Sequence, residues 1–155
     1  MNRVYYSYSE FIDDLKILVK RIDFNFDAIL AVARGGMSIS HMLGEYFNIR
    51  EVFSVNSIGY EDREKLDEIK IFNLPDLSGC KNVLIVDDIV DSGETMKSLV
   101  ERINKSNPTL NIKTASIFYK KSSTFNPDFF VKYTNSWIDF FWSVDLKGKN
   151  GFNDR

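Results

Sequence analysis

The chain has 155 residues, of which 44% are hydrophobic, and its formal net charge is −2. This length suits one domain, and the apolar content is too high for an intrinsically disordered chain. The balanced charge offers no basic surface for non-specific nucleic-acid binding, and no apolar run approaches the roughly 20 residues that span a bilayer. A polar, aromatic N-terminus without a signal-peptide pattern and a single cysteine, Cys80, favour a reducing, cytoplasmic location. With one histidine, any metal site has to use oxygen ligands, as sites for Mg²⁺ or Mn²⁺ do.

Hydrophobic periodicity and turn residues predict alternating helices and strands. Ser7 and Glu10 form the pattern of a capping box before the first helix, and Asn107-Pro108 ends a later one. The elements expected are a helix at 8–22, a strand at 28–33, a helix at 37–47, strands at 52–55 and 82–86, a helix through 96–103, and strands at 112–119 and 129–133. This order is typical of an α/β domain with a mostly parallel, twisted sheet flanked by helices, in which ligands bind beyond the carboxyl ends of strands.

The sequence loses its core pattern between the strands at 52–55 and 82–86. Residues 60–65 are densely charged, and Pro75 and Gly79 punctuate the end of the segment. We expect a surface excursion there, either a β-ribbon or a mobile flap. The tail from 137 onward is aromatic and then polar, and we expect its end to be frayed. Because there is no internal repeat, linker or low-complexity stretch, residues 1–155 are expected to form a single domain.

The segment at 83–95 carries the most specific chemistry. An apolar strand runs into Asp87-Asp88, and hydroxyl residues and Gly93 follow where a helix begins. Two adjacent carboxylates are unfavourable unless a positive or hydroxylic group meets them. Gly93 can turn successive backbone N–H groups inward, and the helix N-terminus adds partial positive charge, so this turn suits a phosphate. The segment therefore offers acceptors for sugar hydroxyls beside donors for a phosphate, which are the two needs of a phosphorylated ribose.

Two other kinds of site begin with an apolar strand and two acids. A Walker-B strand requires a Gly-x-x-x-x-Gly-Lys-Ser/Thr loop, which occurs nowhere in the chain. A response-regulator receiver domain requires about 100 residues after the acidic pair, more than remain here. A site for a phosphorylated ribose is therefore the favoured interpretation of this segment. His41 is expected to pack on a helix face and Cys80 to fill a small buried space, rather than to act in catalysis.

The order of these residues resembles the phosphoribosyl-pyrophosphate signature of type I phosphoribosyltransferases, with Ser92 where the family usually has Thr and Glu94 where Gly or Lys is common. The resemblance implies that Asp87 and Asp88 lie near the ribose hydroxyls, directly or through Mg²⁺ and water, and that the turn cradles the 5′-phosphate. The residues of this segment expected to bind 5-phosphoribosyl-1-pyrophosphate are Asp87, Asp88, Ile89, Val90, Asp91, Ser92, Gly93, Glu94 and Thr95.

Arg34-Gly35-Gly36 follows the strand at 28–33. Two glycines let the backbone approach a ligand closely, and Arg34 adds a fixed positive charge. An ordinary turn has the same pattern, but the acidic segment downstream favours a functional interpretation. In the family a matching loop binds the pyrophosphate, so the resemblance assigns this role to Arg34, Gly35 and Gly36.

Lys120 follows a strand, and Trp137-Ile138 opens an aromatic string. This order resembles the bacterial xanthine-guanine phosphoribosyltransferases. The resemblance implies that Lys120 donates to the 6-oxo group of a purine, that Trp137 stacks on the base and that Ile138 presents backbone groups to its edge. An ammonium group also favours an oxo over an amino substituent, which disfavours adenine. Core packing of Trp137 and solvation of Lys120 are the alternatives, and Lys121 is a competing candidate that strand alternation turns away.

The resemblance also implies a type I phosphoribosyltransferase fold with a flexible lid at about 58–79 and a small C-terminal hood at about 120–155. Tyr60, Arg63 and Lys65 are the candidates in the lid to reach the pyrophosphate on closure, and a merely solvated loop is the alternative for each.

The expected activity is a Mg²⁺-dependent transfer of the phosphoribosyl group from 5-phosphoribosyl-1-pyrophosphate to guanine, xanthine or hypoxanthine, as in purine salvage. Asp91 is expected near N7 of the purine, where it can assist proton movement, and with Asp87 and Asp88 it is a candidate catalytic residue. Asp87 and Asp88 are also the candidate metal ligands. The alternatives are a phosphoribosyltransferase for another nucleobase and a non-catalytic regulator of the same fold. The exposed aromatic content favours a homodimer or homotetramer. Neither a nucleic-acid partner nor an integral membrane segment is expected.

Overall fold

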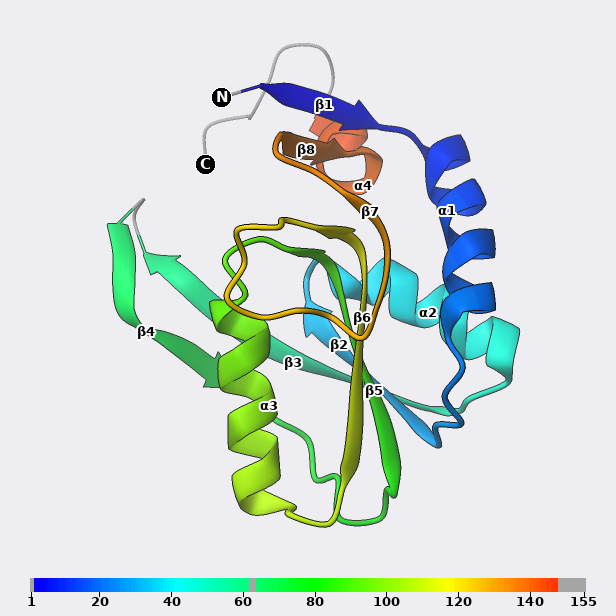
Figure 1. Cartoon of the computed structure of the whole chain (residues 1–155), viewed down its shortest axis with the longest axis vertical. Helices are drawn as coiled ribbons and strands as arrows, with labels where there is room; N and C mark the ends of the chain where they lie inside the picture. The colour runs from blue at the N-terminus through cyan, green and yellow to red at the C-terminus, as the bar shows by residue number, and fades with distance from the viewer. Residues whose placement is uncertain (1, 62–63, 148–155) are drawn as a thin grey trace.

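The computed structural model describes residues 2–61 and 64–147, and it describes side chains outside 59–68. Figure 1 shows a large sheet with helices on its faces and a second, small sheet above one end. The elements are β1 (Arg3–Tyr6), α1 (Tyr8–Arg21), β2 (Ala28–Ala33), α2 (Gly36–Phe47), β3 (Glu51–Glu61), β4 (Glu64–Phe72), β5 (Asn82–Val90), α3 (Glu94–Ser106), β6 (Asn111–Tyr119), β7 (Phe129–Tyr133), β8 (Trp137–Phe140), α4 (Phe141–Val144) and a 3-10 turn at Asp145–Lys147.

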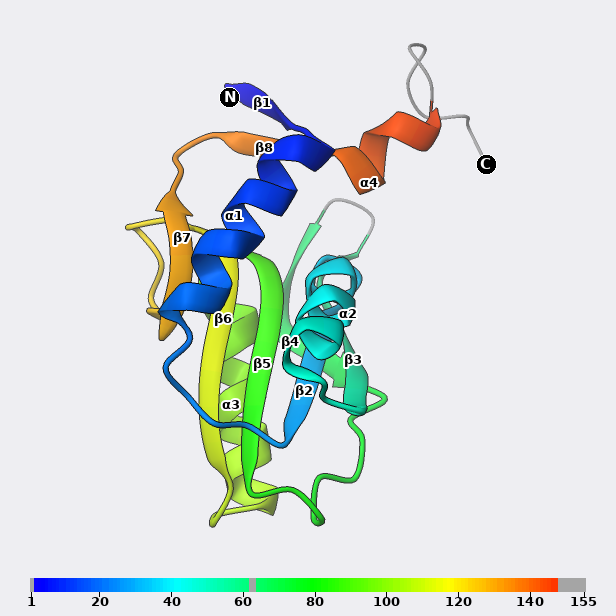
Figure 2. The same cartoon turned by 90° about the vertical axis from the view of Figure 1, so that its right-hand side faces the viewer.

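The large sheet has the strand order β4-β3-β2-β5-β6-β7. Its neighbouring strands are parallel except for β3 and β4, which pair antiparallel. Helices α1 and α2 cover one face and α3 covers the other (Figure 2). The predicted α/β architecture with a mostly parallel sheet between helices is therefore confirmed. No helix among the described residues is long and apolar enough to span a membrane.

The central strands are buried on both faces, which explains their continuous apolar sequences. In β5 the side chains of Leu84 and Val86 pack into the cluster on the α1 and α2 side. Val83 and Ile85 alternate with them and pack into the cluster that contains the buried residues of α3. Helix α1 begins at the predicted capping box, in which Ser7 N–H donates to Glu10 Oε2 at 2.8 Å. This packing fixes the ends of β2 and β5, where the unusual polar residues lie.

Two of the predicted strands are longer in the structure, and the first difference changes the placement of the acidic pair. The strand expected at 82–86 continues to Val90, so Asp87 and Asp88 lie within β5 and not in a turn after it. The extension forms because β6 continues alongside, with Asp87 opposite Ser116 and Val90 opposite Tyr119. The strand expected at 52–55 is likewise only part of β3, which pairs with β4 as an antiparallel ribbon.

The small sheet joins the two ends of the described chain and was not predicted. β1 and β8 pair in parallel, with Arg3 opposite Trp137 and Tyr6 opposite Phe140. Tyr6, Ile138 and Phe140 are buried, whereas Arg3 and Trp137 are directed away from the core. Because the partners lie at opposite ends of the sequence, local periodicity cannot indicate this pairing.

A buried hydrogen bond fixes β1 to α1. Tyr6 is 2% exposed, and its hydroxyl donates to Asp14 Oδ2 at 2.6 Å. Lys132 Nζ on β7 lies 2.7 Å from the same carboxylate oxygen and 5.4 Å from the centre of the Tyr6 ring. Burial, and then the hydrogen bond to Asp14, raises the pKa of Tyr6, so its hydroxyl remains protonated as a donor.

The Tyr6→Phe protein is expected to lose about 1.5–3 kcal/mol of unfolding free energy, because Asp14 loses a neutral donor in a buried position. Urea denaturation at neutral pH measures the difference. Tyr46→Phe makes the same chemical change at a side chain that is 66% exposed and serves as the control. Equal stability of the Tyr6→Phe protein and wild type would show that this hydrogen bond does not support the fold.

Candidate active site

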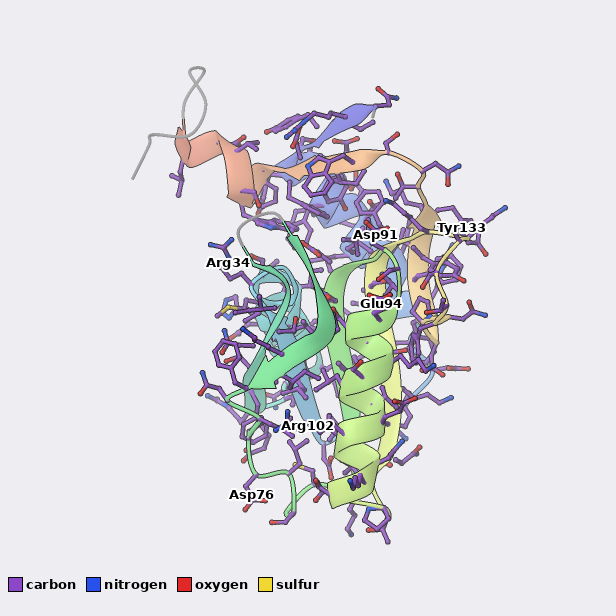
Figure 3. The ribbon with its side chains drawn as sticks, turned by 90° about the vertical axis from the view of Figure 1, so that its left-hand side faces the viewer. Arg34, Asp76, Asp91, Glu94, Arg102 and Tyr133 are labelled. Atoms are coloured by element: carbon purple, nitrogen blue, oxygen red, sulfur yellow. The ribbon has the colours of Figure 1, made fainter. Side chains whose placement is uncertain are left out.

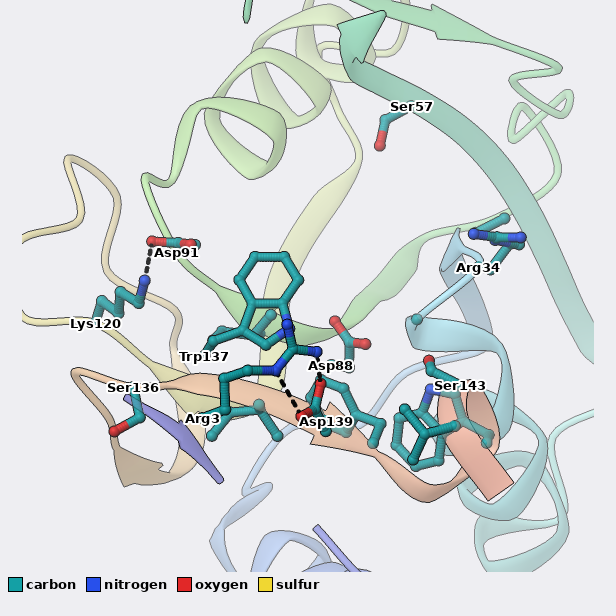
Figure 4. A pocket seen from close by; sticks show the side chains of 17 residues that line it. Arg3, Arg34, Ser57, Asp88, Asp91, Lys120, Ser136, Trp137, Asp139 and Ser143 are labelled. Carbon is teal, nitrogen blue, oxygen red and sulfur yellow. Dashed lines mark hydrogen bonds and ion pairs between the residues drawn. The ribbon is translucent and has the colours of Figure 1, made fainter. Parts of the chain in front are cut away.

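A pocket of about 680 Å³ lies between the carboxyl ends of the central strands and the small sheet (Figure 4). Figure 3 shows Arg34 and Asp91 at this end of the molecule and Asp76 at the opposite end. The predicted site residues that line the pocket are Arg34, Gly35, Asp88, Ile89, Asp91, Lys120, Trp137 and Ile138. Segments separated by most of the chain length therefore meet in one cavity.

The loop after β2 lies directly against the acidic pair. A Cβ atom on Gly35 would lie 2.3 Å from the Asp88 carboxyl carbon, and one on Gly36 would lie 2.1 Å from the Val86 carbonyl oxygen. Both positions therefore exclude a side chain. Gly36 begins α2 close to the backbone of β5, and Gly35 leaves room for the Asp88 carboxyl group. The peptide bond between Ala33 and Arg34 is cis.

The two acids of β5 differ in position. Asp88 lines the pocket, whereas Asp87 does not. The Oδ1 atom of Asp87 accepts a hydrogen bond from the Asp88 backbone N–H at 2.9 Å. Burial raises the pKa of Asp88 to about 6. Burial, and then the neighbouring charge of Asp88, raises the pKa of Asp87 well above its usual range. The pair is therefore unfavourable as two carboxylates unless a cation or hydroxyl group meets it.

The turn after β5 contains a glycine in the conformation that favours this residue. Gly93 adopts a left-handed conformation with φ 84° directly before α3 begins at Glu94. The backbone N–H of Glu94 donates to Ser92 Oγ at 3.3 Å. The Ser92 carbonyl oxygen accepts from the Thr124 backbone N–H at 2.9 Å and from the Thr124 hydroxyl at 3.0 Å. The loop after β6 thus holds the turn in place beside the helix N-terminus.

Lys120 and Asp91 form an ion pair at the other side of the pocket, with Nζ 2.8 Å from Oδ1 (Figure 4). Lys120 is only 9% exposed, and its backbone N–H donates to the Val90 carbonyl oxygen at 3.0 Å. Lys121 is directed elsewhere, with its Nζ 4.6 Å from the centre of the Tyr133 ring. Of these two neighbouring lysines, Lys120 lines the pocket and Lys121 does not.

Several predicted residues lie outside the pocket lining. Lid candidate Arg63 is outside the described residues, and Tyr60 and Lys65 are opposite each other in the β3–β4 ribbon, although their side chains are not described. His41 lines a separate hollow between α2 and β3, and Cys80 is a partly buried free thiol. The remaining predicted ligand-binding residues that do not line the pocket are Gly36, Asp87, Val90, Ser92, Gly93, Glu94 and Thr95.

Sequence reasoning missed other lining residues, notably Arg3, Ser57 and Asp139. Ser57 follows the part of β3 that pairs with β2, where Ala33 is opposite Asn56, so parallel pairing of the two strands could have indicated it. No local sequence pattern could have indicated Arg3, because it reaches the pocket through the pairing of β1 with β8.

Gly35→Ala is expected to lower kcat/KM by about tenfold or more, because the new methyl group has to displace the Asp88 carboxyl group from its place in the pocket. Steady-state kinetics on both substrates of the reaction proposed below measures the effect. Gly79→Ala is the matched control, since nothing lies within 4 Å of its Cβ position. Equal kcat/KM in the two variants would contradict the placement of Asp88.

The donor chemistry of the acidic pair fits a hard divalent cation. Among the described residues no three His, Cys, Asp or Glu side chains group as a complete metal site. Mg²⁺ is commonly held by one or two carboxylates together with substrate phosphates and water, which requires no such group.

Comparison with known proteins places the chain in a family. Residues 7–149 match the phosphoribosyl transferase domain. The chain is 32% identical over 126 residues to a xanthine-guanine phosphoribosyltransferase of Idiomarina loihiensis, covering 78% of this chain and 73% of that enzyme. It is 33% identical over 115 residues to human hypoxanthine-guanine phosphoribosyltransferase, covering 64% of this chain and 52% of that enzyme. The structure of Helicobacter pylori xanthine-guanine-hypoxanthine phosphoribosyltransferase matches with a TM-score of 0.85 and 36% identity, covering 94% of this chain and 97% of that one.

The chain therefore belongs to the phosphoribosyltransferase family. The three relatives named above are purine phosphoribosyltransferases, the branch of the family that the sequence resembles.

Proposed function

We propose that this protein transfers the phosphoribosyl group from 5-phosphoribosyl-1-pyrophosphate to a 6-oxopurine, giving the nucleoside 5′-monophosphate and pyrophosphate. The observation that carries the proposal is the single pocket in which Asp88 and the loop at Gly35 face the Lys120–Asp91 pair. One side offers acids for a ribose and the other offers an ammonium group for a 6-oxo substituent. The names of the relatives support the same substrate class.

The proposed donor site has two parts. The turn from Asp91 to Thr95 binds the 5′-phosphate through its backbone N–H groups and hydroxyls, at the N-terminus of α3. The loop of Arg34, Gly35 and Gly36 binds the pyrophosphate, with Arg34 supplying a fixed positive charge at the pocket wall. Asp87 and Asp88 would hold Mg²⁺, which when bound neutralises charge on the leaving pyrophosphate.

The chemistry that these residues support is displacement at the anomeric carbon. The bond to pyrophosphate breaks as positive charge develops on the ribose, and the Asp88 carboxylate favours that charge. A purine ring nitrogen then attacks the anomeric carbon and its N–H proton leaves. We assign a part in that proton movement to Asp91, and its ion pair with Lys120, the proposed base-binding residue, supports this assignment.

The proposed base site uses one face and one edge of the purine. Trp137 is 49% exposed in the pocket, so a face of the indole ring is free to stack on a base. Lys120 donates to the 6-oxo group, and the amino group of adenine would bring a donor against a donor. Ile138 presents backbone groups to the base edge.

We also assign a lid, a hood, an oligomeric state and a cellular setting to the protein. A lid at about 58–79 covers the pocket, with Tyr60, Arg63 and Lys65 as its candidate contacts, and a C-terminal hood at about 120–155 carries the base site. Residues 1–155 act as one catalytic domain in a homodimer or homotetramer, in a reducing cytoplasmic setting where Cys80 stays a free thiol.

The experiment is a panel of nucleobases with 5-phosphoribosyl-1-pyrophosphate and Mg²⁺, followed by pyrophosphate release. Turnover of guanine, xanthine or hypoxanthine with little turnover of adenine, uracil or orotate is expected. Turnover restricted to another base would favour a phosphoribosyltransferase of different specificity. Tight donor binding with no turnover on any base, together with RNA or DNA binding, would favour a regulator of the same fold.

A further inference from the structure

Strand β1 contributes a charged side chain to the wall of the proposed base site. Arg3 is opposite Trp137 in the parallel pairing of β1 with β8, so the two side chains share a face of the small sheet. Arg3 Nε donates to Asp139 Oδ2 at 2.9 Å, and Nη2 donates to Asp139 Oδ1. Its guanidinium carbon lies 6.0 Å from the centre of the Trp137 ring. All three side chains line the pocket (Figure 4).

Asp139 anchors the Arg3 guanidinium group. The hydrogen bond from Arg3 chiefly lowers the pKa of Asp139, and the Trp137 side chain shifts it in the same direction. Asp139 is therefore a carboxylate at neutral pH, and it accepts both of the hydrogen bonds that the Arg3 guanidinium donates. Its side chain is 20% exposed, compared with 62% for Arg3, so Arg3 closes the group from the solvent side.

The local structure around Trp137 otherwise restrains it weakly. β8 has four residues, and within the described chain it belongs to a sheet of two strands only. Sheets of two strands are marginally stable by themselves. A stacking side chain on such a strand binds a flat ligand well only if its ring is held in a fixed plane, because ordering it on binding would weaken affinity.

We propose that the Arg3–Asp139 ion pair positions the Trp137 ring for stacking, so that Arg3 is a positioning residue and β1 is part of the base site. This inference rests on the proposed function. An exposed ion pair alone contributes little to stability. The effect is therefore expected in binding of the base and not in folding or in binding of the phosphorylated sugar.

The test is a double-mutant cycle with Arg3→Gln, Asp139→Asn and the double variant, all measured with guanine, xanthine and hypoxanthine. We expect KM for the base to rise about fivefold in each single variant and no further in the double variant. KM for 5-phosphoribosyl-1-pyrophosphate and the melting temperature are expected to stay unchanged. Arg3→Lys keeps the charge but not the paired contact, so an intermediate KM for the base is expected.

Lys16→Gln is the matched control, since it breaks an ion pair of Lys16 with Asp13 that is exposed on α1 and away from the pocket. An Arg3→Gln protein with wild-type KM for every base would overturn the inference, as would equal increases in KM for both substrates. If wild type turned over no base, the proposed function would fail separately. Calorimetric binding of guanosine 5′-monophosphate would then decide the inference, with unchanged affinity in Arg3→Gln counting against it.

Discussion

The Asp88→Asn protein is expected to turn over at least about 100-fold more slowly than wild type at saturating concentrations of both substrates. Asp88 is the member of the acidic pair that lines the pocket, and its carboxyl group lies against the loop at Gly35. Because burial places its pKa at about 6, the group is mainly ionised at pH 7.5. A neutral amide neither stabilises positive charge on the ribose nor supplies an anionic ligand to Mg²⁺. Pyrophosphate release measures the turnover.

The control for this variant is Asp13→Asn, which makes the same change at an exposed position on α1. It is expected to leave kcat unchanged. Near-normal turnover in both Asp88→Asn and Asp87→Asn, with circular dichroism spectra that match wild type, would remove the acidic pair from the mechanism.

The acidic pair also predicts how stability depends on pH in metal-free buffer containing EDTA. The folded-state pKa values of Asp87 and Asp88 lie above the unfolded value of about 3.9, so the folded state holds more protons. The contribution of this pair to the free energy of unfolding is therefore most favourable below pH 4, and it becomes less favourable as the pH rises through about 6. Asp87→Asn removes one ionisation and keeps an oxygen that can accept the Asp88 N–H bond.

We therefore expect the metal-free Asp87→Asn protein to be more stable than wild type at pH 7 by roughly 2 kcal/mol, and its stability to change less between pH 4 and 6. Urea denaturation across this pH range measures both effects. A variant that is less stable than wild type at pH 7 would show that ionisation of the pair does not destabilise the metal-free protein.

Lys120→Gln is expected to lower kcat/KM for guanine by about 10- to 150-fold, which corresponds to loss of one charge-assisted hydrogen bond. Lys120 is nearly buried and its ammonium group is held 2.8 Å from Asp91, so its donor is fixed before the base arrives. The shorter glutamine side chain removes the charge and leaves Asp91 without its partner. Discrimination between 6-oxo and 6-amino purines is expected to shrink as well, and parallel kinetics with guanine and adenine measures it.

Lys121→Gln is the matched control, because it changes the same residue type one position later. Its ammonium group lies over the Tyr133 ring and does not line the pocket. Guanine kinetics close to wild type is expected for this variant. A larger loss in Lys121→Gln than in Lys120→Gln would move the base site to the other face of the loop.

The central fold could be predicted because each of its elements carries a local signal. The continuous apolar run of β2 reflects burial on both faces, and the capping box before α1 marks a helix start. The ends of the strands could be predicted less well from the sequence. β5 continues through Asp87 and Asp88 because β6 supplies ladder partners, which local polarity does not reveal. β1 and β8 were missed because each is short and finds its partner at the far end of the chain.

Site residues that stand in a sequence motif could be predicted, whereas those that depend on distant contacts could not. Asp88 and Gly35 stand in motifs whose residue order is informative by itself, and the structure brings them into contact distance. Asp139 is the acid of the aromatic string that Trp137-Ile138 opens, but the sequence assigned no role to it or to Arg3. Their contact depends on a pairing between distant strands. The Lys120–Asp91 ion pair joins two residues that the sequence assigned separately to the base, without indicating that they bind each other.

The most direct measurement is a crystal structure of the protein soaked with 5-phosphoribosyl-1-pyrophosphate and Mg²⁺. We predict density for the 5′-phosphate at the turn before α3, for the ribose beside Asp88, and for the pyrophosphate near Arg34. Density for the intact donor at another place on the molecule, with the turn at Gly93 empty, would contradict this prediction.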